Sequence, residues 1–244
     1  MKRSLSAPVL VFLLLASHIS VCAQSDLHQP VEAVRKLYQQ NLGAGSALYT
    51  GKVYERYWAG IKGNPFFLSD QFVQGSVTYQ GTSYENIPLL YDFAKDALIT
   101  RDFTGELSME LLKEKISRFS LGQHEFVKIE PDSGSSMRPG FYELLYSGPA
   151  SVLVKRTNQV VRVTQREDEP GKLSADRQFA EYDDYYVLKN GQYIPVRGEA
   201  DLLNVLKDHR AELRKFLARR PKSYRKDPAA AIVAAVSYYE QLKN

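Results

Sequence analysis

The chain has 244 residues, of which 44% are hydrophobic and 25% are charged, and its formal net charge is +4. This length is enough for one domain with its own core, with or without an appendage, and the sequence contains no internal repeat and no low-complexity tract. Cys22 is the single cysteine, which excludes an intramolecular disulfide and a cysteine-based zinc site.

Residues 1–23 have the pattern of a secretory signal peptide. A basic start precedes an apolar run over residues 9–16, and Val21 and Ala23 occupy positions −3 and −1 of a cleavage site. The apolar run is too short to span a bilayer, and no other segment is long enough. A lipoprotein anchored through Cys22 is the disfavoured alternative, because Val21 stands where a small residue is expected. We therefore expect an exported protein, periplasmic or extracellular, whose mature chain contains no cysteine.

The mature chain is expected to start with a helix and continue as a β domain. Apolar residues at helical spacing predict a helix between Pro30 and Leu42, and the glycine-containing stretch 43–45 ends it. From Leu48 the period changes to two, and we expect about nine or ten antiparallel strands. Residues 24–200 would form this domain. The predicted fold class is α+β with one large curved antiparallel sheet.

Two hairpins give the clearest strand signals. In GSVTYQGTSYENIPLLYD, residues 75–92, β-favouring runs flank a turn at residues 80–82. In YYVLKNGQYIPV, residues 185–196, the turn pair Asn190-Gly191 tolerates positive φ at both positions.

Two other segments of the β domain are harder to assign. Residues 106–121 fit either a helix or two strands joined by residues 113–115, and we favour the two strands. Residues 160–163 are interpreted as a separate short strand, and the polar residues 166–176 as a loop.

Two helices are expected to close the chain as a basic hairpin over residues 201–244, packed on the β domain. Asp201 can cap the first helix, whose apolar residues share one side, and Pro221 ends it. Asp227 and Pro228 supply a cap and a first-turn proline for the second helix.

No constellation of catalytic or metal-binding residues emerges from the sequence. The mature histidines His28, His124 and His209 are far apart, whereas a metal site needs clustered ligands. No nucleophile elbow, phosphate-binding glycine loop or dinucleotide motif is present. The neighbouring carboxylates Asp183 and Asp184 would point to opposite faces of a strand. We therefore expect no cofactor and no enzymatic activity, and a hydrolase with an unrecognised carboxylate pair is the remaining alternative.

Tyrosine is the most distinctive part of the composition, with 16 residues, most of them on predicted strands. The simpler interpretation is that a tyrosine ring packs well on a sheet while its hydroxyl reaches water. The functional interpretation is a concave sheet face that takes an acyl chain, a glycan or a peptide. The candidate ligand contacts are Tyr57, Tyr79, Tyr84, Tyr91, Tyr146 and Tyr186.

Basic charge is concentrated near the C-terminus. Between Lys207 and Lys226 nine Lys and Arg residues occur with two acidic ones, Asp208 and Glu212. A solvated helix face is one interpretation. The other is a surface for an anionic partner, because so few acidic residues are available for pairs within the helix. The candidate patch comprises Lys207, Arg210, Arg214, Arg219, Arg220, Lys222, Arg225 and Lys226.

Several segments carry a resemblance to a known group of proteins. They are IKGNPFF, GSVTYQGTSYENIPLLYD, FYELLYSG, YYVLKNGQYIPV and SYRKDPAAAIVAAVSYYEQL. Together these segments resemble uncharacterised exported proteins of Bacteroidota over nearly all of the mature chain. The resemblance implies export but no assigned activity, so it transfers no catalytic residue. The predicted fold is also similar to that of periplasmic lipoprotein carriers, an analogy that no motif supports.

The leading hypothesis is a non-enzymatic, monomeric binding or scaffold protein of the cell envelope. Its basic helices would face an envelope protein or an anionic membrane surface, and nucleic acid is disfavoured outside the cytoplasm. The alternative is a periplasmic carrier that holds an apolar ligand, such as a lipid or a lipoprotein acyl chain, in the concavity of the sheet.

Overall fold

The computed structural model describes residues 48–57, 60–166, 173–220 and 224–243. The described residues belong to one unit of the chain, Gly45–Asn244. The predicted signal peptide and the predicted first helix lie outside them.

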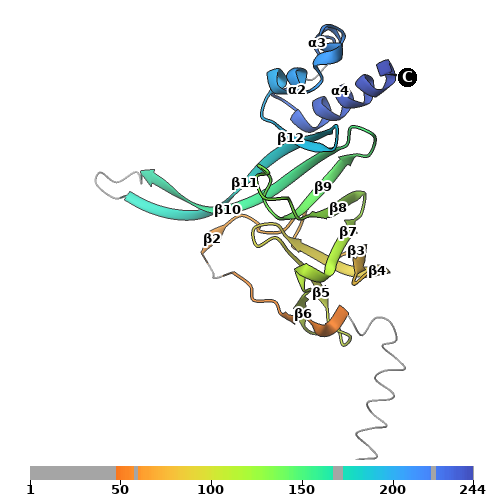
Figure 1. Cartoon of the computed structure of the whole chain (residues 1–244). Helices are drawn as coiled ribbons and strands as arrows, with labels where there is room; N and C mark the ends of the chain where they lie inside the picture. Colours follow the sequence, from red (N-terminus) through yellow and green to blue (C-terminus); the bar gives the residue numbers. More distant parts are fainter. Residues whose placement is uncertain (1–47, 58–59, 167–172, 221–223, 244) are drawn as a thin grey trace, which may run out of the picture. The chain divides into compact units, whose positions relative to one another are not determined.

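A twelve-stranded sheet forms most of this unit (Figure 1). Eleven strands follow one another in the order β1-β6-β5-β4-β3-β7-β8-β9-β10-β11-β12, and β2 pairs with β11. The strands are β1 (Lys52–Val53), β2 (Ile61–Lys62), β3 (Val73–Tyr79), β4 (Thr82–Asp92), β5 (Ala97–Arg101), β6 (Ser108–Glu110), β7 (Ile116–Leu121), β8 (His124–Ile129), β9 (Gly140–Tyr146), β10 (Val152–Arg166), β11 (Leu173–Lys189) and β12 (Gln192–Val196). The α+β class and the large sheet are thus confirmed, with more strands than predicted.

The sheet is mixed rather than purely antiparallel as predicted. The exception is the pair formed by β2 and β11, in which Ile61 lies opposite Arg177 in a parallel register. After β2 the chain passes close to Phe179, because a Cβ atom on Gly63 would lie 3.4 Å from the Cβ atom of Phe179. This return of an early segment to a late strand is a long-range contact that periodicity does not encode.

Both predicted hairpins are confirmed, with two-residue turns. Gln80 and Gly81 have φ values of 51° and 79°, and Asn190 and Gly191 have 53° and 77°. Two consecutive positive φ values are those of a type I′ turn, whose twist matches that of the paired strands. The turns fix the registers Tyr79 to Thr82 and Lys189 to Gln192.

Residues 106–121 form two strands, as favoured. β6 and β7 are joined by a 3₁₀ turn at Lys113–Lys115. The two strands do not pair with each other, since β6 pairs with β5 and β7 pairs with β3 and β8.

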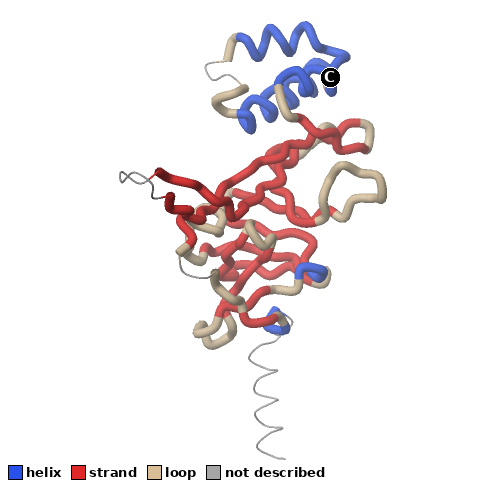
Figure 2. Tube along the Cα trace, turned by 90° about the vertical axis from the view of Figure 1, so that its left-hand side faces the viewer, coloured by secondary structure: helices blue, strands red, loops and turns tan. Residues whose placement is uncertain are grey.

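The long hairpin of β10 and β11 corrects two predictions. Residues 160–163 are not a separate strand, and the loop predicted over 166–176 is shorter, because pairing continues to Arg166 opposite Leu173. β9 pairs with residues 152–154 of β10 only and β2 pairs with residues 177–178 of β11 only, so the end of the hairpin extends past its neighbours as an arm (Figures 1 and 2). Pairing between the two strands continues through residues that local sequence patterns assigned to a separate strand and a loop.

Three α-helices follow the sheet, where two were predicted. They are α2 (Glu199–Val205), α3 (Arg210–Ala218) and α4 (Pro228–Lys243), and a 3₁₀ turn at Lys207–His209 separates α2 from α3. The break is held from β11, because Lys189 Nζ donates to the carbonyl oxygen of Val205 at 2.8 Å and to Asp208 at 2.8 Å. Lys189 of the sheet thus binds the carbonyl oxygen of Val205, which in a continuous helix would accept a backbone N–H from the next turn.

The predicted helix caps are confirmed in one case. Asp227 Oδ1 accepts the N–H of Ala230 at 3.1 Å, and Pro228 begins α4. The N-cap of α2 is Gly198 rather than Asp201, whose carboxylate accepts the N–H of Arg197 at 3.0 Å instead. The carboxylate still satisfies a free donor at this helix start, from a position inside the helix.

Two large clusters of buried side chains form the core. One joins the helices to the sheet and contains Val152, Val187, Val196, Leu202, Leu206, Leu213, Ile232, Val236 and Tyr239. The other fills the sheet around β3, β4 and β7 and is aromatic, with Tyr79, Tyr91, Phe119, Phe126 and Phe141. Phe119 and Phe126 stack with ring centroids 4.6 Å apart. In the part of the chain that the structure describes, no helix combines the length and the apolar character needed to cross a bilayer.

Candidate functional site

The predicted basic residues lie on the helical part of the molecule. The structure describes seven of the eight, namely Lys207, Arg210, Arg214, Arg219, Arg220, Arg225 and Lys226, and Lys222 lies outside the described residues. Six of the seven are exposed, and Arg220 is half-buried. We call these seven residues, together with the exposed Lys215 of α3, the basic helical surface. Lys215 belongs to the same basic stretch of sequence but was not among the eight residues of the predicted patch.

Amphipathicity of α3 directs these side chains outward. Leu213 and Leu217 of this helix are buried in the core that joins helices and sheet. Arg210 and Arg214 are one turn apart and exposed, so they share the side of the helix that borders the buried leucines. The packing of two leucines therefore fixes where the arginines point.

Within the described residues, the basic helical surface forms no ion pair with an acidic side chain. Among the described residues, no hydrogen bond or ion pair joins any of its side chains to a carboxylate, and Nε of Arg220 is buried without an acceptor. Asp208, one of two acidic residues in this stretch of sequence, is already bound by Lys189 and by the hydroxyl of Tyr239 at 2.9 Å. Both partners lower the pKa of Asp208. The positive charge is therefore even less compensated than the sequence indicated.

Several basic side chains of the sheet, unlike those of the basic helical surface, form ion pairs with carboxylates among the described residues. Lys155 pairs with Asp96, Arg138 with Asp184, and Arg156 with both Glu143 and Asp183. Each of these pairs joins residues that are distant in the sequence. Many basic side chains of the sheet therefore form ion pairs with carboxylates, whereas those of the basic helical surface are mostly exposed to solvent.

The six candidate tyrosines do not form one face. Tyr79 and Tyr91 are 0% and 1% exposed inside the aromatic core, and Tyr84 packs against the same cluster. Tyr146 packs against the core that joins helices and sheet, and Tyr186 belongs to a third cluster. The structure thus supports the simpler interpretation for Tyr79 and Tyr91, which act as core residues.

Hydrogen bonds hold two further tyrosines. The hydroxyl of Tyr57 donates to Asp92 Oδ1 at 3.1 Å, and its ring meets that of Phe179 edge to face at 5.0 Å. The hydroxyl of Tyr146 donates to Glu240 of α4 at 2.6 Å. Of the six candidates, Tyr186 lines the pocket described next.

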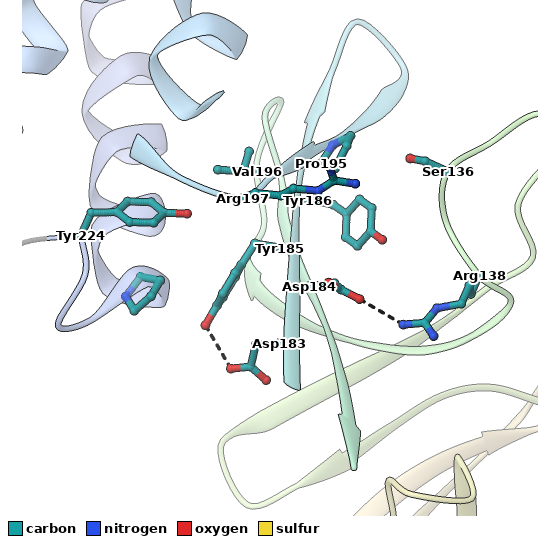
Figure 3. Close-up of a pocket in the computed structure, with 11 residues that line it drawn as sticks. Ser136, Arg138, Asp183, Asp184, Tyr185, Tyr186, Pro195, Val196, Arg197 and Tyr224 are labelled. Atoms are coloured by element: carbon teal, nitrogen blue, oxygen red, sulfur yellow. Dashed lines mark hydrogen bonds and ion pairs between the residues drawn. The ribbon is translucent and has the colours of Figure 1, made fainter. Parts of the chain in front are cut away.

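A pocket of about 430 Å³ lies at the edge of β11 where β12 ends (Figure 3). Three tyrosines and four charged side chains contribute to it, from the sheet, the loop before β9 and the turn before α4. Its lining residues are Ser136, Arg138, Asp183, Asp184, Tyr185, Tyr186, Pro195, Val196, Arg197, Tyr224 and Pro228. We call it the β11-edge pocket.

Two carboxylates of the β11-edge pocket are already bound. Asp184 Oδ2 accepts from Arg138 at 3.0 Å. Asp183 Oδ2 accepts from Arg156 at 2.8 Å and from the hydroxyl of Tyr185 at 3.0 Å. The two carboxylates thus have different arginine partners, although both line the same pocket.

The guanidinium of Arg197 is the uncommitted charge of the β11-edge pocket. Within the described residues it has no hydrogen-bond or ion-pair partner. Burial and the charge of Asp184 raise the pKa of Tyr186, and the charges of Arg138 and Arg197 lower it. Burial also raises the pKa of Tyr224 to about 12. The pocket therefore offers phenol hydroxyls and a cation that is unpaired among the described residues, groups that can donate hydrogen bonds to a carboxylate.

Sequence reasoning missed most of the β11-edge pocket. It had weighed Asp183 and Asp184 as surface charges, but Arg138 and Arg197 carried no signal because they come from different loops. Only the end of β12 at Val196 brings them together. Among the described residues, no cluster of three His, Cys, Asp or Glu side chains could hold a metal ion.

Comparison with known proteins adds no relative, since no family model, no curated protein and no solved structure matches the chain. The resemblance to uncharacterised exported proteins of Bacteroidota stays a prediction.

Proposed function

We propose that the chain is a non-enzymatic binding or scaffold protein of the cell envelope, exported through its N-terminal signal peptide. The basic helical surface is its contact with an anionic partner. The single observation that carries this proposal is that the eight described cations of this surface lie on a packed helical region, and none of them forms an ion pair with a described carboxylate.

Packing supports a role in binding rather than a flexible tail. The helices share a core with β10, β11 and β12, and the ring of Phe216 stacks on that of Tyr238 with centroids 4.4 Å apart. A rigid array of cations loses little conformational entropy when it binds, and it attracts anions over about a Debye length. Membrane headgroups present such anions at high density. The electrostatic attraction contributes about 1 kcal/mol of binding free energy for each Lys or Arg near the surface. An anionic membrane surface is therefore the favoured partner.

The alternative function, a carrier of an apolar ligand, finds no favouring observation. It requires tyrosine rings that line an open cavity, whereas Tyr79 and Tyr91 are buried among other aromatic side chains.

The experiment that tests the proposal is a charge reversal on α3 and the turn before it. The variant K207E/R210E/R214E of the mature chain is compared with wild type in sedimentation with vesicles of phosphatidylglycerol and phosphatidylethanolamine. A matched control reverses three exposed arginines of the sheet region, R56E/R162E/R177E, which changes the net charge equally. We expect the helical variant to lose binding by at least about tenfold and the control to keep most of it.

Two outcomes would overturn the proposal. The first is that wild type does not sediment with anionic vesicles and does not fractionate with the envelope. The second is that the helical variant and the control lose binding equally. If wild type fractionates with the envelope without binding lipid vesicles, the partner is an acidic envelope protein.

A further inference from the structure

The edge of β11 is interrupted. β2 pairs with this edge as far as Gln178, and β12 pairs with it from Tyr185 onward. The six residues 179–184 between these two strands span about 20 Å at the usual rise of a strand. We call this stretch the β11 gap, and the β11-edge pocket lies at its β12 end, where Figure 3 shows Asp183 and Asp184 beyond the end of β12.

Hydrogen-bond direction shows which backbone groups the gap exposes. The N–H of Leu188 donates to the carbonyl oxygen of Ser151 at 2.8 Å, on the β10 side of β11. Successive residues of a strand direct their N–H and C=O groups to opposite edges. Glu181 and Asp183 are an odd number of residues from Leu188, so their backbone donors and acceptors point into the gap.

Side-chain exposure agrees with an open edge. Glu181, Tyr182, Asp183 and Asp184 are all exposed, and Tyr182 is 48% exposed although it lies in the middle of a long strand. Gly63 covers Phe179 at the β2 end, so the open part comprises residues 180–184. Unpaired strand edges of this kind accept an added strand from a partner.

Geometry excludes pairing of the gap with the β11 edge of a second copy of the chain. If β11 of another molecule paired with the gap, the β12 and β2 strands of that molecule would occupy the same row as the β11 of the first. The gap therefore admits a short extended segment and not the edge of a second sheet.

Charge selects among such segments. Arg197 follows the last residue of β12 and stands at the mouth of the gap without a partner among the described residues, and the carboxylates of Asp183 and Asp184 are bound by other arginines. We infer that the β11 gap binds an extended segment of about five residues from a partner protein by strand addition, with an acidic side chain of that segment seated beside Arg197 in the β11-edge pocket. This inference goes beyond the contact of the basic helical surface and uses different residues.

Proline scanning of the gap gives the sharpest test. The mature chain is first used to select from a displayed library of random hexapeptides, and the affinity of an enriched peptide is measured by fluorescence anisotropy. Glu181→Pro removes a backbone donor that faces the gap and leaves the pairing with β10 intact, since proline is tolerated on an edge. Glu181→Val changes the same side chain but keeps the donor. We expect Glu181→Pro to weaken binding by at least about tenfold and Glu181→Val to change it by less than about threefold.

A second comparison tests the acidic contact. We expect Arg197→Gln to weaken binding of the enriched peptide by about tenfold. The same variant should leave the affinity of the peptide with its acidic residue replaced by the amide unchanged. If Glu181→Pro does not fold, methylation of alternate peptide nitrogens of the ligand replaces it and should abolish binding to wild type.

The inference is overturned if no peptide is enriched, if Glu181→Pro binds like Glu181→Val, if an N-methylated ligand binds like its parent, or if the enriched peptides carry no acidic residue. The variant K207E/R210E/R214E should bind the peptide like wild type, which separates failure of this inference from failure of the proposed function.

Discussion

Asp96 and Lys155 form a buried ion pair, with 2.9 Å between Oδ2 and Nζ, that joins the turn after β4 to β10. The carboxylate also accepts from the hydroxyl of Tyr91 at 2.6 Å and from Lys113. Lys155 in turn donates to the carbonyl oxygen of Phe141 at 3.0 Å. One carboxylate thus ties together four segments of the sheet.

This network gives stability a defined dependence on pH. Burial alone would raise the pKa of Asp96, but Lys155, Lys113 and Tyr91 together lower it below its ordinary value of 3.8. A carboxylate with a lowered pKa in the folded state contributes stability above its unfolded pKa, and this contribution is lost as pH falls through the folded pKa. We expect Asp96→Asn to lower the free energy of unfolding by about 3–5 kcal/mol at pH 7, because it leaves Lys155 buried without its counterion.

Urea denaturation of wild type and Asp96→Asn between pH 7 and pH 3 measures this effect. The difference in the free energy of unfolding should begin to shrink toward pH 3, because the carboxylate of the unfolded chain becomes protonated while that of the folded chain stays charged. An equal difference at both ends of the range would show that the charge of Asp96 is not what stabilises the sheet.

Two tyrosines of the aromatic core should respond oppositely to loss of the hydroxyl. The hydroxyl of Tyr79 is buried without a hydrogen-bond partner among the described residues, whereas that of Tyr91 donates to Asp96. We expect Tyr79→Phe to leave stability unchanged or to raise it by up to about 1 kcal/mol. Tyr91→Phe should lower it by about 1–3 kcal/mol, because it removes a charge-assisted hydrogen bond.

Thermal and urea unfolding of both variants measure the change in the free energy of unfolding. The two values can be compared directly, because each substitution removes one hydroxyl from a tyrosine. If Tyr79→Phe proved as destabilising as Tyr91→Phe, the Tyr79 hydroxyl would have to bind a partner, and the tyrosine-lined ligand site would regain support.

A glycine of β3 is required for close approach of the neighbouring strand. A Cβ atom on Gly75 would lie 2.1 Å from the carbonyl oxygen of Ser120 on β7, and the register of β3 against β4 shifts at this point. Gly75→Ala should therefore cost about 1–3 kcal/mol through displacement of backbone. Gly81, in the turn, has φ of 79° but no atom within 4 Å of its Cβ position. Gly81→Ala should cost about 1 kcal/mol from backbone conformation alone, and a larger loss than for Gly75→Ala would contradict this ranking.

The sequence predicted local structure better than long-range contacts. Turn chemistry located both type I′ hairpins, since Asn190 and Gly191 act through their own φ angles. The break between α2 and α3 was missed because it depends on Lys189, which lies in a hairpin outside the helices. The parallel pairing of β2 with β11 was missed for the same reason, because no period within either strand records the other.

The candidate sites divide in the same way. The basic helical surface could be predicted because its residues are close together in the sequence and the apolar positions of α3 take up the buried side of that helix. The β11-edge pocket could not, because Arg138, Asp184 and Arg197 come together only through the register of β11 with β12. The six tyrosines share a composition signal, but the structure assigns them to separate clusters.

One carboxylate adds hydrogen bonds to the apolar packing of α4 on the sheet. Glu240 Oε1 accepts the N–H of Ala150 at 2.7 Å, and Oε2 accepts the hydroxyl of Tyr146 at 2.6 Å. One donor is the last residue of β9 and the other lies in the turn before β10, so Glu240 joins the last helix to these two strands. We expect Glu240→Ala to destabilise this contact by about 1–3 kcal/mol, because it leaves a backbone donor without an acceptor.

Hydrogen exchange resolves the consequence residue by residue. In Glu240→Ala the amide of Ala150 and the amides of α4 should exchange at least about tenfold faster, while the amides of the β3–β4 hairpin keep the wild-type rate. Gln241→Ala, a change at the exposed neighbouring position, serves as the control and should alter neither. If the proposed function holds, Glu240→Ala should also weaken vesicle binding although it removes no positive charge, because the cations act as an array only while the helices stay docked. Unchanged vesicle binding with accelerated exchange would mean that the basic helices bind without the support of the sheet.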